Sequence, residues 1–94
     1  MAAGYIVHFA RKSNQDYSDV DEYLKSFETW CSLSSNNDTW IVLANDHSAG
    51  AIRRDVAQLA PNGTHVFVLQ WAVSGDSSWF CSSNVDKWMS SWFK

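Results

Sequence analysis

Two apolar runs constrain the fold of this chain more than any other feature of its sequence. Ile41-Val42-Leu43 and Val66-Phe67-Val68-Leu69 consist of residues that favour strands, and neither run contains a polar position. Successive side chains of a strand point to opposite faces of a sheet, so such runs predict strands with apolar contacts on both faces. We therefore expect both runs to be central strands of one sheet, covered on either side.

A third segment repeats its apolar residues at helical spacing. These positions, separated by one, three or four residues, are Val20, Tyr23, Leu24, Phe27, Trp30 and Cys31. Such a stripe lies on one face of a helix, so the spacing predicts one helix that continues to Cys31. Ser18 and Asp21 have the spacing of a capping box and predict its N-terminal cap.

Two further helices are expected later in the chain. Ser48 predicts the N-cap of the first, whose apolar positions recur at helical spacing until Pro61-Asn62-Gly63 ends it. The second is predicted near the C-terminus, with a cap from Ser83 and Asp86. Its apolar positions are Val85, Trp88, Met89, Trp92 and Phe93.

The remaining strands complete a recognisable order. Residues 5–10 predict the first strand, and a short strand around Leu33, a turn at Asn36-Asn37-Asp38 and the run 40–44 predict a hairpin. The resulting order, β-α-β-β-α-β-α, is typical of an α+β ferredoxin-like βαββαβ sandwich with an additional C-terminal helix. We expect a single domain over residues 1–94, with a core at 4–71 and a C-terminal loop and helix at 72–94.

The composition narrows the class of protein. Hydrophobic residues make up 46% of the 94 positions and charged residues 18%, which predicts a folded chain. A net charge of −3 supports nucleic-acid binding only weakly, because neutralising phosphates requires clustered Lys and Arg. No apolar stretch is long enough to cross a bilayer, and no secretory signal pattern opens the chain, so we expect no membrane contact and a cytoplasmic location.

Several short motifs resemble a known family. They are Tyr5-Ile6-Val7, Thr39-Trp40-Ile41-Val42, Ser48-Ala49, Ile52-Arg53 and Val66-Phe67-Val68. Over residues 4–71 the chain resembles the small ferredoxin-fold proteins related to the CRISPR-associated Cas-two nuclease and to the VapD ribonucleases. The resemblance implies a βαββαβ fold, a homodimer, and an Asp at the end of the first strand that holds a divalent metal at the dimer axis.

The chain departs from that family at the metal position. The matching residue is Ala10, which offers no oxygen ligand to a hard cation. We therefore expect no cofactor and no metal ligand, with Mg²⁺ needed only if the chain is a nuclease after all. For that alternative, Asp16 is a candidate displaced ligand, although an acidic loop residue is far more often a turn former.

Two histidines offer a second route to catalysis. The last strand of a ferredoxin-like sheet runs antiparallel beside the first, so His8 and His65 are expected to approach each other. With Arg11 nearby, they form a candidate acid/base and phosphate-binding group for RNA cleavage. The competing interpretation, which we prefer, is a half-buried His8 and a solvent-exposed His65.

Aromatic residues crowd the last quarter of the chain. The candidate binding residues among them are Trp71, Trp79, Trp88 and Trp92, and the two adjacent basic pairs add Arg11 and Arg53. Trp is enriched at interface hot spots, so these positions predict a protein partner, and intramolecular packing of the last helix is the alternative.

Two functions therefore remain open. The first is a non-catalytic, Cas-two-like binding or assembly module, a homodimer acting in or against prokaryotic nucleic-acid defence systems. The second is a metal-dependent or histidine-based endonuclease acting on RNA or DNA. The sequence favours the first, because Ala10 replaces the acid and the net charge is negative.

Overall fold

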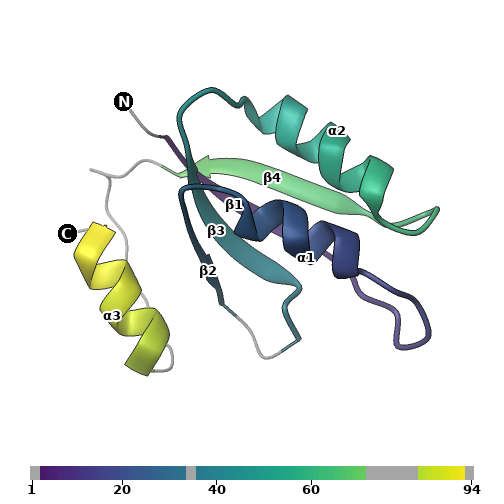
Figure 1. Cartoon of the computed structure of the whole chain (residues 1–94), viewed down its shortest axis with the longest axis horizontal. Helices are drawn as coiled ribbons and strands as arrows, with labels where there is room; N and C mark the ends of the chain where they lie inside the picture. The colour runs from purple at the N-terminus through teal and green to yellow at the C-terminus, as the bar shows by residue number, and fades with distance from the viewer. Residues whose placement is uncertain (1–2, 34–35, 72–82, 93–94) are drawn as a thin grey trace.

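The computed structural model describes residues 3–33, 36–71 and 83–92, and it has a four-stranded antiparallel sheet and three helices (Figure 1). The elements are β1 (Ala3–Phe9), α1 (Ser18–Lys25), β2 (Thr29–Ser32), β3 (Thr39–Ala44), α2 (Ala49–Leu59), β4 (Val66–Trp71) and α3 (Ser83–Trp92). The sheet order is β2-β3-β1-β4, and every neighbouring pair is antiparallel. This small α+β architecture is compatible with the expected ferredoxin-like fold.

Helices α1 and α2 pack on one face of the sheet, which we call the helical face (Figure 1). Alternate residues of β1 and β3 point into this layer, as the two-residue period of a strand requires. The buried residues here are Tyr5, Val7, Phe9, Tyr17, Val20, Leu24, Trp40, Val42, Ala44, Ile52, Val56 and Ala60. This cluster is the main core of the described residues.

Helix α3 packs on the opposite face of the sheet. Its Val85 and Met89 are buried against Ile41 and Leu43 of β3, and Figure 1 shows α3 beside β2. α3 thus covers the part of this face that β3 forms, whereas Phe67 and Leu69 of β4 remain exposed.

The predicted position of one apolar run is wrong. β3 is central, as expected, but β4 is an edge strand that pairs only with β1 among the described residues. Phe67 and Leu69 of β4 are each 62% exposed, whereas every residue of β3 from Trp40 to Ala44 is buried. An all-apolar run indicates two apolar faces, but it does not indicate which face another element covers.

The first helix is shorter than predicted, and its cap is different. α1 ends at Lys25, and Trp30 and Cys31 belong to β2, which pairs with β3. The two strand-forming residues continued the helical spacing by coincidence, and pairing with β3 determined their structure. The N-cap of α1 is Tyr17, which makes no side-chain cap hydrogen bond, so the predicted Ser18 and Asp21 cap is wrong.

The second helix begins and ends where predicted. The Ser48 hydroxyl accepts a hydrogen bond from the backbone N–H of Ala51 at 3.1 Å. The helix ends at Leu59, before Pro61, and Gly63 follows with a φ of 85°, in the left-handed region that favours glycine. Both signals are local, so they were readable from the sequence.

A tyrosine on α1 ties the two helices together. The Tyr23 hydroxyl donates a hydrogen bond to Oδ2 of Asp55 on α2 at 2.8 Å. Burial first, and then the hydrogen bond and charge of Asp55, raise the pKa of Tyr23 above its ordinary value. A raised pKa in the folded state stabilises the protein fully below the ordinary tyrosine pKa, about 10, and this stabilisation is lost as the pH rises further.

Tyr23→Phe should therefore change the response to alkali. At neutral pH we expect the free energy of unfolding to fall by about 1 kcal/mol, because one partly buried hydrogen bond is lost. Above the ordinary tyrosine pKa, the difference in the free energy of unfolding between the variant and the wild type should disappear. Urea denaturation across the alkaline range measures both effects, and a gap that stays constant with pH would contradict the assignment.

Candidate functional site

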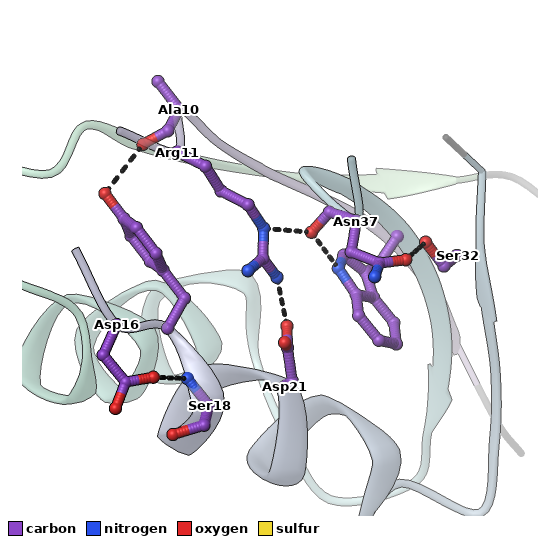
Figure 2. Close-up of polar contacts among 9 residues, drawn as sticks. Ala10, Arg11, Asp16, Ser18, Asp21, Ser32 and Asn37 are labelled. Atoms are coloured by element: carbon purple, nitrogen blue, oxygen red, sulfur yellow. Dashed lines mark hydrogen bonds and ion pairs between the residues drawn. The ribbon is translucent and has the colours of Figure 1, made fainter. Parts of the chain in front are cut away.

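Arg11, two residues after the end of β1, makes polar contacts with two other parts of the fold (Figure 2). Its Nε donates a hydrogen bond to the backbone carbonyl of Asn37 at 2.9 Å, and its guanidinium forms an ion pair with Asp21 of α1. The side chain therefore links the loop after β1 to α1 and to the turn between β2 and β3.

The turn that receives Arg11 is built around Asn37. This residue has a φ of 55°, a left-handed conformation that Asn tolerates better than most side chains. Its carbonyl also accepts a hydrogen bond from Nε1 of Trp40 at 2.8 Å, and its side-chain oxygen accepts one from the Ser32 hydroxyl at 2.6 Å. One turn residue thus fixes both strands of the hairpin and the arginine.

Two aromatic rings hold the guanidinium from the other side. Its central carbon lies 5.0 Å from the ring centroid of Phe9 and 5.2 Å from that of Tyr17. The Tyr17 hydroxyl accepts a hydrogen bond from the backbone N–H of Lys12 at 3.1 Å. With an ion pair, a hydrogen bond and two cation–π contacts, Arg11 acts chiefly as a structural cross-link.

A surface hollow of about 390 Å³ lies beside this cross-link. It is lined by Arg11, Lys12, Ser13, Gln15, Tyr17 and Asn36. These side chains provide cationic and hydrogen-bonding groups, and they include no carboxylate, thiol or imidazole. The hollow can accept a small polar or anionic group, and its described lining offers no imidazole, carboxylate or thiol as general base or nucleophile.

Arg11→Lys tests the cross-link. A lysine keeps the charge but loses the planar fork that serves Asn37 and Asp21 together, so we expect the free energy of unfolding to fall by about 1–2 kcal/mol. Arg53→Lys is the matched control, because Arg53 lies exposed on α2, and it should change stability by less than about 0.5 kcal/mol. Equal effects of the two substitutions in urea denaturation would contradict the structural role.

The structure brings β1 and β4 together, as the histidine hypothesis requires, but the strand register pairs His8 with Phe67 and not with His65. Nδ1 of His8 is hydrogen-bonded to Oγ1 of Thr39 at 2.8 Å, and its ring centroid lies 6.5 Å from that of Phe67. His65 precedes β4 and is exposed. Among the described residues, no hydrogen bond or ring contact joins the two histidines. The half-buried His8 and exposed His65 match the interpretation preferred from the sequence.

Asp16 forms a turn at the start of α1. Its Oδ1 accepts a hydrogen bond from the backbone N–H of Ser18 at 2.9 Å, and this bond, with that of the Ser18 side chain, lowers the pKa of Asp16 below its ordinary value. The expected turn-forming role is confirmed. Ala10 lies exposed directly after β1, and nowhere in residues 3–33, 36–71 and 83–92 do three His, Cys, Asp or Glu side chains gather in a metal-binding arrangement.

The predicted aromatic binding residues do not form one described surface. Trp88 is half-buried on α3 and packs against the second core cluster, whereas the backbone of Trp71 lies in β4 opposite Gly4. Trp92 is the last residue of α3, and Trp79 lies outside the described residues. Of this set, the structure describes the side-chain packing of Trp88 alone, and that packing is intramolecular.

Sequence reasoning missed the two most exposed large apolar residues in the described parts of the chain. These are Phe67 and Leu69, which lie beside His8 and Ile6 on the face opposite α1 and α2. The expected strand order did indicate that this strand is exposed, because the last strand of a βαββαβ fold lies at the edge of its sheet. We call Phe67 and Leu69, with the neighbouring Ile6 and His8, the β4 strip.

Comparisons of the chain with family models, with curated proteins and with solved structures found no match. In the ranges that the structure describes, none of the helices has the length and apolar character needed to span a membrane.

Proposed function

We propose that this chain is a non-catalytic binding or assembly module with a ferredoxin-like βαββαβ core and an additional C-terminal helix. The observation that carries the proposal is the exposure of Phe67 and Leu69, 62% each, next to each other on one strand face. Large adjoining apolar side chains in water are typical of interaction sites. The proposed ligand is a protein surface that covers the β4 strip.

The contacts of the candidate catalytic residues support a binding role. Asp16 accepts a hydrogen bond from the backbone N–H of Ser18, the first residue of α1. His8 is hydrogen-bonded to Thr39, and its ring lies beside that of Phe67. The net charge of −3 and the uncharged β4 favour a protein over a nucleic acid as the ligand. The proposed biological setting, assembly in or against prokaryotic nucleic-acid defence, rests on the resemblance to Cas-two-like proteins.

Isolation of a tagged copy from its native cell, after brief chemical cross-linking, tests the binding role. The wild-type chain should be recovered together with a macromolecular partner, and an untagged copy of the same chain counts as a partner. A Phe67→Lys, Leu69→Lys double variant should return none, because two ammonium groups replace the apolar contact. The matched control is Leu59→Lys on α2, another exposed large apolar residue. Recovery of the same partner with the double variant would refute the proposed surface.

The endonuclease alternative has its own test. Purified protein is incubated with labelled single- and double-stranded RNA and DNA, in Mg²⁺, Mn²⁺ or EDTA. We expect that the purified protein does not cleave any of these nucleic acids. Cleavage that disappears in His8→Ala, His65→Ala or Asp16→Ala would overturn the non-catalytic proposal.

A further inference from the structure

The two edges of the sheet are protected very differently. β2 forms one edge, has only four residues and follows Glu28, and the Lys25 ammonium lies 5.6 Å from the ring centroid of its Trp30. Short length and nearby charge are the usual devices that keep an edge strand from pairing with another chain. This edge is therefore poorly suited to association.

β4 has none of these devices. It has six residues, Val66–Trp71, without a charge or a proline, and its register with β1 runs without a bulge. Among the described residues no strand pairs with its outer edge. The outward N–H and C=O groups of such a strand are a template for one more antiparallel strand.

In the part of the chain that the structure describes, no helix or loop covers the face beside this edge. α3 packs over β3 and lies beside β2, at the other end of the sheet order from β4 (Figure 1). Phe67 and Leu69 of β4 are exposed. An added strand at the β4 edge would place its own side chains next to these two residues. Backbone hydrogen bonds and apolar side-chain contacts therefore both favour a binding partner that adds a strand at the β4 edge.

We infer that the occupant is a second copy of this chain, paired antiparallel through β4 to make one continuous eight-stranded sheet. This inference rests on the proposed binding function and names its partner. A strand can pair with its own copy about a two-fold axis whenever its sequence is self-complementary. With the axis beside Val68, Phe67 lies opposite Leu69 of the partner subunit, and this aromatic–aliphatic pair occurs twice.

Charge supports a second copy at this edge. Each chain carries a net charge of −3, so two copies repel each other unless their contact surface is free of acidic groups. β4 has no acidic or basic residue, and the Val68 register opposes only apolar residues at its centre. A six-residue edge with two exposed apolar side chains is smaller than a standard interface, so we expect a dissociation constant in the micromolar range.

Sedimentation equilibrium of the full chain, from low micromolar to millimolar concentration, measures the association. The wild type should pass from 10.7 kDa toward twice that mass. Phe67→Lys should raise the dissociation constant more than about tenfold, because two ammonium groups enter one symmetric contact. Leu59→Lys should change it less than about twofold. Circular dichroism confirms that each variant stays folded, as the exposure of both positions predicts.

Amide hydrogen exchange distinguishes edge pairing from stacking of sheet faces. When the concentration rises, outward-pointing amides of β4 should exchange more slowly, whereas face stacking leaves this edge open to water. A monomer at every concentration would overturn the inference, as would a dimer whose β4 amides are unaffected or whose affinity Phe67→Lys leaves unchanged. The purified chain could also be a monomer while the tagged copy still returns a partner from its native cell, and the Phe67→Lys, Leu69→Lys variant loses that partner. This result would overturn the inference that the partner is a second copy, and it would leave the proposed binding function unchanged.

Discussion

Trp40→Ala is expected to lower the free energy of unfolding by about 3–5 kcal/mol, because it leaves a large cavity beneath α1 and α2. Trp40 is 1% exposed in central strand β3, and its indole N–H donates to the Asn37 carbonyl at 2.8 Å. The substitution therefore removes core volume and one of the bonds that hold the hairpin turn. Because small domains have a total stability of about 5–15 kcal/mol, much of the variant should be unfolded at ambient temperature.

Trp30→Ala is the matched control for this prediction. The Trp30 ring contacts that of Trp40 at a centroid distance of 5.5 Å, but Trp30 is 37% exposed on edge strand β2. Its removal should lower the stability by about 1 kcal/mol, as is common for a partly exposed contact. Urea denaturation followed by circular dichroism compares the two variants, and equal losses would show that Trp40 is not the buried centre of the hairpin.

Features encoded by neighbouring residues were predictable from the sequence. The start and end of α2 depend on Ser48 and on Pro61-Asn62-Gly63, which lie within a few residues of the helix. The strand 39–44 was also recognised, because five consecutive apolar residues with high strand propensity leave few alternatives. In both cases the local preference and the tertiary packing favour the same structure.

Features that depend on distant partners were not predictable in the same way. Trp30 and Cys31 continue a helical spacing, and only pairing with Val42 and Ile41 of β3 makes them a strand. The Arg11 cross-link joins residues 26 positions apart, and its geometry depends on the left-handed backbone of Asn37. Neither contact leaves a periodic signal in the sequence.

The candidate site shows the same division. Asp16 was recognised as a turn former from its neighbours, and the bond to Ser18 confirms this. The β4 strip was missed, because its exposure depends on where α3 packs, and the apolar spacing of α3 does not specify which half of the sheet it covers. That placement is therefore the structural feature on which the proposed interface depends most.

Met89→Ala tests the placement of α3. Met89 is 2% exposed and packs against Ile41 and Leu43, which are 0% and 7% exposed. The alanine leaves a cavity between helix and sheet, so we expect the free energy of unfolding to fall by about 2–4 kcal/mol. Met89→Leu, which conserves volume, should lower it by less than about 1.5 kcal/mol.

The same substitution relates the fold to the proposed interface. β3 contributes alternate residues to both core clusters, so α3 should unfold together with the sheet in one urea transition, for Met89→Ala as for the wild type. When α3 packs less tightly, Ile41 and Leu43 become accessible and extend the apolar surface from the β4 strip across the sheet. We therefore expect the alanine variant to bind the dye ANS and to self-associate more strongly than the wild type. A stability loss below about 0.5 kcal/mol with no dye binding would mean that α3 does not cover β3 in solution, and that the exposed face is larger than the β4 strip.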